Sequence, residues 1–405
     1  MPSFRQADVA AIRIGISLGM SGLLNELRAI ALRSLRRMYR PDERLFAFRL
    51  RRRGGEDVLE GASVRYSAMA LIGLANEPAD VARHVLRGES SEELCDQLVA
   101  RLSGVRDLGD VAATLWAAAL LERPSAIPAF QRLIELDPLS SEHSTVERAW
   151  ALTALCANNA ELMRPELATS LANQLIATFR PGSGAFLHSL PEARQSRMRR
   201  HVSCFADLVY PVIALSRYGV RAKRADCLDI AEQCASAMCE GQGADGQWWW
   251  HFDNRSGEIV ERYPVYAVHQ DAMAPMALFA AEECCGADFG GPIRRGLEWL
   301  DHAPEIGGSL IDRKADTIWR KVARREPNKM SRGIHAACSA LHLGWKMPGL
   351  EAIFRPTLVD FESRPYHMGW ILHAWPEHRV RQFSSRWEGE KHEGRPGGVA
   401  VASSV

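Results

Sequence analysis

Several marks of specialised protein classes are missing from this chain of 405 residues. It contains no run of eighteen apolar residues, so we expect no membrane-spanning helix. Its net charge is only +1, and no excess of positive charge points to a nucleic acid or an anionic membrane as a partner. It has neither the GxxxxGK[ST] phosphate loop nor the HExxH zinc motif.

The nine cysteines form no CxxC pair and are odd in number, which argues against a disulfide framework. Some lie in apolar helical runs, as Cys156 does. The sequence therefore predicts buried, reduced thiols and a cytoplasmic protein. The stretch Ala10–Leu24 is interrupted by Arg13 and Ser17, which favours an amphipathic helix over a signal peptide.

Apolar and amphipathic helical stretches alternate along the chain. The apolar ones are Tyr66–Ala75, Val111–Leu121, Ala149–Cys156, Phe205–Tyr218, Ala272–Glu282, His335–Trp345 and Gly369–Trp375. Between them lie more charged stretches, among them Ser91–Leu102, Met163–Phe179, Ala222–Cys239 and Pro292–Asp301. In a ring of helical hairpins, inner helices touch neighbours on most sides, whereas outer helices keep one face in water. The alternation predicts an all-α fold, an (α/α)6 toroid of helical hairpins.

A short pattern repeats with a constant period ahead of the apolar helices. Gly184, Gly246 and Gly308 are 62 residues apart, and each is followed two residues later by a large apolar side chain, Phe186, Trp248 or Leu310. Glycine permits a tight turn, and the large side chain can fill the gap between adjacent hairpins. Three copies in phase indicate a structural repeat.

The chain is expected to divide into three parts. Residues 1–40 are predicted to form an N-terminal helix that packs on the toroid, and residues 41–378 the toroid itself. Residues 379–405 are rich in Gly, Ser and charged residues, which predicts a flexible tail.

Polar residues at the starts of inner helices are the candidates for a functional site, because these starts surround one mouth of the ring. The candidates for substrate binding are Arg65, Tyr66, Glu147, Arg148, Asp207, Tyr210, Trp248, Tyr266, Gln270 and Trp370. Simpler interpretations exist for some positions. Asp110 suits a helix N-cap, and Glu147 with Arg148 suits a local ion pair.

The sequence His269-Gln270-Asp271 is the strongest single candidate, because three polar side chains before an apolar helix are costly to bury unless they are used. Histidine can transfer protons near neutral pH. We predict His269 and Asp271 as a proton-handling pair, with capping and packing as the alternative. Further catalytic candidates are His335, Tyr366 and His367. No ligand spacing supports a metal, and no cofactor is expected.

Two other segments indicate a type of ligand. Trp248–Phe252 alternates its aromatic side chains, so one set can fill a gap between hairpins while the other stacks on a ligand. A basic run precedes the helix of Asp207 and contains Arg194, Arg197, Arg199 and Arg200. Folded over the mouth, this run would attract a uronate, phosphate or diphosphate; the alternative is a solvated loop.

The segment Gln242–Trp248 resembles the QW repeat (QxxDGxW) of terpenoid cyclases and protein prenyltransferases. The resemblance implies the same toroid over about residues 40–378. It does not extend to their chemistry, because neither the DxDD acid motif nor the DxC zinc ligands of those families occur here.

The same toroid is shared by six-hairpin glycosidases, uronate lyases and N-acylglucosamine 2-epimerases, which this chain resembles in the His, Tyr, Arg, Asp and Trp of its mouth. The resemblance implies an enzyme that hydrolyses, eliminates from or epimerises a sugar or anionic glycan by acid/base chemistry. Hydrolysis would need two carboxylates about 5–5.5 Å or about 6.5–9.5 Å apart, and Asp207 or Glu147 could pair with Asp271. The alternatives are an isoprenoid diphosphate enzyme and a non-catalytic toroid that binds a glycan or protein.

Overall fold

The computed structural model describes residues 19–157, 164–190, 195–326 and 330–393. Within these ranges, no helix has the length and apolar character needed to cross a membrane. The start of the predicted first helix, residues 10–18, lies outside the described part of the chain.

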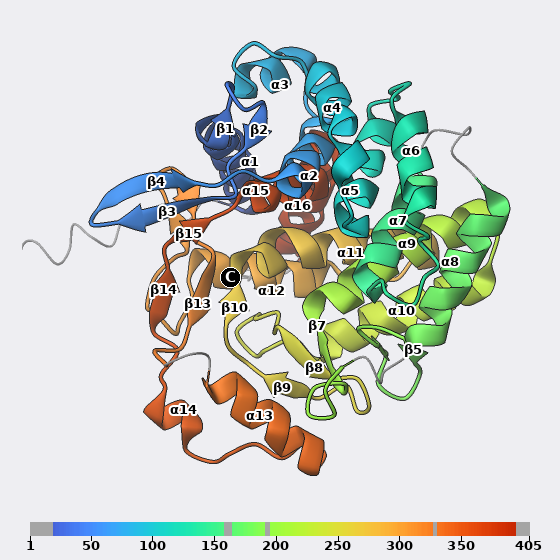
Figure 1. Cartoon of the computed structure of the whole chain (residues 1–405). Helices are drawn as coiled ribbons and strands as arrows, with labels where there is room; N and C mark the ends of the chain where they lie inside the picture. Colours follow the sequence, from blue (N-terminus) through green and yellow to red (C-terminus); the bar gives the residue numbers. More distant parts are fainter. Residues whose placement is uncertain (1–18, 158–163, 191–194, 327–329, 394–405) are drawn as a thin grey trace, which may run out of the picture.

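Six helices of the described chain form an inner ring in which each packs against the next and the last returns to the first (Figure 1). They are α2 (Val64–Leu74), α5 (Leu108–Leu120), α7 (Thr145–Leu155), α9 (Phe205–Ala222), α11 (Ala274–Cys285) and α15 (Pro365–Ala374). The outer helices are α1 (Met20–Met38), α4 (Ser91–Ala100), α6 (Ala126–Glu135), α8 (Pro165–Thr178), α10 (Ala225–Glu240) and α12 (Gly290–Asp301). The predicted all-α (α/α)6 toroid is therefore confirmed.

The inner helices approach closely where their side chains are smallest. A Cβ at Gly73 of α2 would lie 2.2 Å from the carbonyl oxygen of Gly369 in α15, and one at Gly369 would lie 2.4 Å from that of Met69. Contacts this short leave no room for a side chain. Two glycines thus set the distance at which the first and last inner helices close the ring.

Two helices differ from the sequence-based expectation. The run His335–Trp345 was expected to be an inner helix, but α13 (Met330–Leu341) packs on strand β9 (Ile259–Glu261) outside the ring, with Leu341 and Trp345 exposed. The segment from residue 379 was expected to be a flexible tail. Instead α16 (Glu377–Glu393) buries Val380 and Phe383, which anchor its first turns. The short helices α3 (Ala79–Val85) and α14 (Leu350–Ile353) complete the set described.

Short antiparallel strands connect the helices. The three-stranded sheets have the orders β15-β3-β4, β7-β8-β9 and β10-β13-β14. Their members are β3 (Arg49–Arg53), β4 (Glu56–Glu60), β7 (Val202–Cys204), β8 (His251–Asp253), β9, β10 (Val265–Tyr266), β13 (Lys321–Ala323), β14 (Leu358–Asp360) and β15 (Glu362–Ser363). The two-stranded pairs are β1 (Tyr39–Arg40) with β2 (Leu45–Phe46), β5 (Phe179–Arg180) with β6 (Ala185–Phe186), and β11 (Ile311–Asp312) with β12 (Thr317–Ile318).

The repeated turns join neighbouring hairpins as expected. Gly184 and Gly246 have φ values of +64° and +98°, while in the third copy the positive φ falls one residue earlier, at Gly307. Beside Gly246, the Gln242 side-chain amide donates to the carbonyls of Gly246 and Pro292, at 3.0 and 2.9 Å. Trp248 is buried between the two hairpins. The QW-like segment is thus a structural joint between α10 and α12.

We predict that Gly246→Ala destabilises the protein by more than about 1 kcal/mol, because φ is positive and the new Cβ would lie 2.1 Å from the Arg295 carbonyl oxygen. Urea unfolding followed by circular dichroism measures the change. Gly291→Ala is the matched control, since its Cβ meets nothing closer than 3.8 Å. Equal stability of the two variants would contradict the role of this turn.

Candidate functional site

Side chains from the starts of several inner helices meet at one mouth of the ring. Arg65 of α2 donates from Nε to Asp110 of α5 over 2.6 Å and also bonds Asp107. The ring of Tyr66 lies 4.8 Å from that of Tyr366 at the start of α15. Polar and aromatic groups at the starts of three inner helices are therefore in contact with one another.

Asp271 and His367 form a buried pair across this mouth. Nε2 of His367 lies 2.8 and 2.9 Å from the two carboxylate oxygens of Asp271, whose exposed fraction is 0%. Burial raises the pKa of Asp271, and the neighbouring His367 opposes that rise. Because a carboxylate accepts, Nε2 donates, and Nδ1 has no hydrogen-bond partner among the described residues. Both carboxylate oxygens of Asp271 are thus engaged by His367 inside the protein.

His269 lies two residues before Asp271, in the π-helical turn η4 (His269–Met273). Its ring stacks on Phe205 at 4.4 Å and lies 5.1 Å from Tyr266. Nδ1 is 3.4 Å from the Trp248 carbonyl oxygen, which can only accept, so this nitrogen carries the hydrogen and Nε2 is the basic one. Burial lowers the pKa of His269 to about 3. The imidazole is therefore neutral at physiological pH.

Four predicted ligand-binding residues instead have packing roles. The indole of Trp248 fills the space beside Gly296, and Gln270 bonds the backbone of Trp248 and Tyr266. The indole of Trp370 donates to the Tyr210 hydroxyl over 3.0 Å, and both residues are buried. These side chains lie in the core around the histidines, because the inner helix starts continue directly into the apolar ring.

Other candidates are placed away from the mouth or bonded locally. His335 on α13 lies 2.8 Å from Glu261, which also bonds Arg324 at 3.0 Å, so it belongs to a buried ionic group of its own. Arg148 is buried and donates to the Ser140 carbonyl. Glu147 accepts from the Ser144 amide at 2.7 Å in a capping box, yet it also lines a groove at this end of α7.

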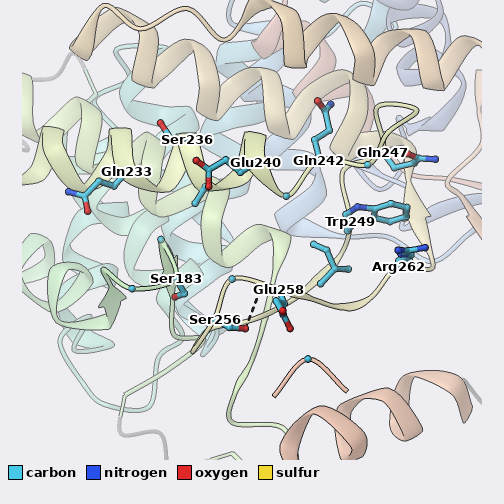
Figure 2. Close-up of a pocket in the computed structure, with 18 of the residues that line it drawn as sticks. Ser183, Gln233, Ser236, Glu240, Gln242, Gln247, Trp249, Ser256, Glu258 and Arg262 are labelled. Carbon is cyan, nitrogen blue, oxygen red and sulfur yellow. Dashed lines mark hydrogen bonds between the residues drawn. The ribbon is translucent and has the colours of Figure 1, made fainter. Parts of the chain in front are cut away.

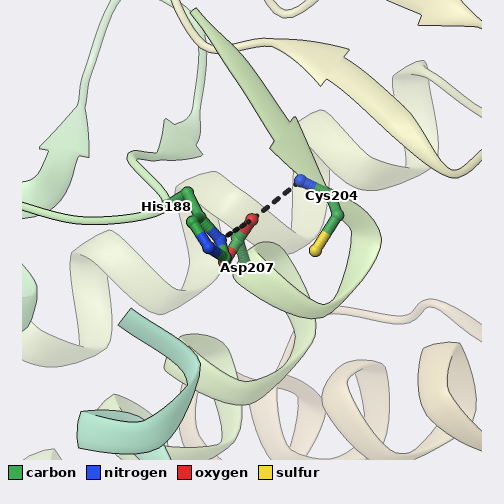
Figure 3. Close-up of side chains that lie close together, drawn as sticks. All are labelled: His188, Cys204 and Asp207. Carbon is green, nitrogen blue, oxygen red and sulfur yellow. Dashed lines mark hydrogen bonds and ion pairs between the residues drawn. The ribbon is translucent and has the colours of Figure 1, made fainter. Parts of the chain in front are cut away.

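A histidine that the sequence did not single out faces that groove. Nδ1 of His188 lies 3.0 Å from Asp207, which raises the pKa of His188, and 43% of its side chain is exposed (Figure 3). Asp207 is fully buried and also caps the Cys204 amide at 2.8 Å. His188, Cys204 and Asp207 lie close enough to share a metal ion. Both carboxylate oxygens of Asp207 already have hydrogen-bond partners in His188 and the Cys204 amide. Burial also raises the pKa of the Cys204 thiol well above its usual value.

A cavity of about 270 Å³ lies beside the mouth of the ring that holds His269 and His367, on the far side of Tyr266. Trp250 and Tyr266 form one wall, with their rings 5.1 Å apart, and Tyr266 contacts His269 directly. Lys321 and Arg332 line the same cavity. Tyr266 was predicted from the sequence as a binding residue. The position of Arg332 beside Trp250 was not predicted, because α13 was expected in the inner ring.

A larger groove of about 1270 Å³ lies along α10 and the glycine turns. Figure 2 shows Gln233, Glu240, Trp249, Glu258 and Arg262 around it. No described residue that lines this groove is a histidine. The larger groove therefore offers carboxylates, among them Glu240 and Glu258, whereas the mouth of the ring offers His269 and His367.

No family model matches this sequence, and a search of curated proteins also finds no match. Solved structures do resemble the fold. A sugar epimerase from a ruminal bacterium has a TM-score of 0.59 at 11% identity, covering 89% of this chain and 98% of its own. A cellobiose 2-epimerase from Bacillus thermoamylovorans has a TM-score of 0.59 at 12% identity, covering 88% and 99%. A family 88 glycosyl hydrolase from Bacteroides vulgatus reaches 0.52 at 12%, covering 89% and 99%. All three share the toroid.

The buried imidazole of His269 predicts a specific loss of stability in acid. Between pH 6.5 and about 3 the unfolded chain binds a proton at this histidine and the folded chain does not, so the free energy of unfolding falls as pH falls. His269→Phe should remove a slope of at most about 1.4 kcal/mol per pH unit. Urea unfolding at several pH values measures it. The exposed His302, replaced in the same way, is the control, and parallel curves for wild type and His269→Phe would contradict the prediction.

Proposed function

We propose that this protein is a carbohydrate-active enzyme that uses His269 and His367 for acid/base chemistry, and that the reaction is epimerisation. The observation that carries the proposal is the complementary arrangement of the two rings. Each has one nitrogen fixed by an acceptor, Trp248 or Asp271, and the other without a partner in the described chain. Two proton-transfer groups at one mouth are what inversion at a carbon next to a carbonyl requires.

The steps follow from that arrangement. On an open-chain aldose, Nε2 of His269 takes the proton from the carbon beside the carbonyl. The C–H electron pair forms a C=C bond, and the carbonyl π pair moves to oxygen as an enediolate. His367, as imidazolium paired with Asp271, returns a proton from Nδ1 to the opposite face, and the C=O bond forms again. Proton exchange with water resets both rings.

Hydrolysis receives less support from this geometry. Asp271 was a member of both predicted carboxylate pairs, and it is fully buried against His367; Asp207 is fully buried against His188. Neither can flank a glycosidic bond in this arrangement. An isoprenoid enzyme would need a large dry cavity, whereas the cavity beside the histidines is small and lined by charged groups.

The comparisons support the same proposal at the level of fold, since two of the similar structures are sugar epimerases. A small sugar or oligosaccharide is the expected ligand. We also infer a reducing, cytoplasmic setting, which the nine free cysteines support.

We predict that the protein exchanges the C2 proton of its sugar with solvent. Incubation with glucose, mannose, N-acetylglucosamine and cellobiose in D₂O should remove the C2–H signal from the proton NMR spectrum and produce the C2 epimer. His269→Ala and His367→Ala should each slow exchange at least about 100-fold, the range of general acid–base catalysis, while His302→Ala should not. Release of glucose from cellobiose without exchange would replace epimerisation by hydrolysis.

Asp271 should act through His367 and not on the sugar. Asp271→Asn keeps the size but loses the charge, so kcat should fall about 10- to 100-fold while KM changes little. The pH profile of kcat should shift as well, which a purely structural defect would not produce. An unchanged kcat, or a loss confined to KM, would refute the positioning role.

A further inference from the structure

The cavity beside His269 is lined by aromatic side chains and by an arginine that lies over one of them. The guanidinium carbon of Arg332 lies 4.5 Å above the centre of the Trp250 ring, and Trp250 is only partly buried. Tyr266 meets Trp250 edge to face and contacts His269. A sugar held in this cavity would therefore lie next to the guanidinium of Arg332 and next to Tyr266, which contacts the proposed base.

Arg332 has no acidic partner in the part of the chain that the structure describes. No carboxylate forms an ion pair with it, and its buried Nε has no acceptor. By contrast, Lys321 in the same cavity pairs with Asp360 at 3.2 Å, and Arg324 pairs with Glu261. An arginine whose fork of donors is left open at a cavity is the group that proteins use for carboxylates and phosphates.

Another cation, Arg199, does not line this cavity. Arg199, from the basic run, is half-buried, and burial together with Arg332 lowers the pKa of its guanidinium. His251 stacks on Trp250 at 4.0 Å, and its pKa is lowered by burial and by Arg332 and Arg199. The other basic residues of that run, Arg197 and Arg200, are exposed, and Arg194 lies outside the described residues.

The two carboxylates that line the cavity are engaged by groups other than Arg332. Asp360 is engaged by Lys321, and Glu326 accepts from the Ser331 amide at 2.6 Å at the start of α13. Neither forms an ion pair with Arg332. Neither carboxylate that lines the cavity balances the charge of Arg332, so an anionic group of a ligand would fit there.

We propose that Arg332 binds an anionic group, a carboxylate or a phosphate, on a sugar held in this cavity beside Tyr266. This deepens the function proposed above and rests on it for the identity of the ligand as a sugar. The substrate would then be a sugar acid or a sugar phosphate, and Arg332 would select it over neutral sugars.

Titration calorimetry with the full chain tests the proposal, using glucuronate, glucose 6-phosphate and glucose as ligands. At least one anionic sugar should bind about tenfold or more tightly than glucose. Arg332→Ala should reduce that preference to within about twofold, and high salt should weaken it in the wild type. Arg197→Ala, which removes the same charge from an exposed position two residues from Arg199, is the matched control and should keep the preference.

Preference for glucuronate alone identifies a carboxylate site, and preference for glucose 6-phosphate alone identifies a phosphate site. Equal binding of all three sugars, or a preference that survives Arg332→Ala, overturns the proposal. If Arg332→Ala does not fold, as judged by circular dichroism, Arg332→Gln replaces it and should likewise lose the preference.

The same panel separates this proposal from the proposed function. Binding preference lost in Arg332→Ala, without C2 exchange of any of the three sugars, would leave the anion site standing and refute epimerisation. C2 proton exchange on glucose without any binding preference for an anionic sugar would support epimerisation and refute the anion site. His269→Ala should lose exchange yet keep the binding preference, because it changes the base and not the cation.

Discussion

The buried bond between Asp271 and His367 is the contact on which both the ring and its mouth depend. It joins η4, which leads into α11, to α15, so it links the fifth inner helix of the ring to the sixth. The Asp271 carbonyl also accepts from the Trp375 indole at 2.6 Å, so one residue is tied to α15 by side chain and backbone. Removing one partner of such a pair leaves an uncompensated polar group in the core, which costs far more than an exposed pair would. Architecture and chemistry are therefore coupled at one residue.

Electrostatic environment gives the two histidines different properties on the same scaffold. His269 has aromatic neighbours and a carbonyl, which keep it neutral. His367 has a carboxylate, which fixes its ring and its donor nitrogen. Such divergence of environment is how one fold provides an acid and a base at neutral pH. The apolar core beneath them, including Trp370 and Tyr210, excludes water and keeps these differences large.

The ring could be predicted from the alternation of helices and the glycine period, because both reflect local turns and burial that sequence records directly. His269 and His367 were predicted as site residues for a similar reason, as polar residues at the starts of apolar helices. The positioning role of Asp271 was not predictable, since His367 lies far away in sequence. His188 and Arg332 were also missed in their present roles. They lie on a loop and on a helix outside the ring, where periodicity says nothing about neighbours.

The closure of the ring has a consequence for the order in which the chain can fold during synthesis. Strand β3 pairs with β15, so that Leu50 lies opposite Ser363, and α2 packs against α15. A ribosome delivers the first partner long before the last one. Until then α2 has an uncovered apolar flank, and non-local contacts of this kind are slow to form. A nascent chain of this architecture is an incomplete arc whose open end is a target for chaperones.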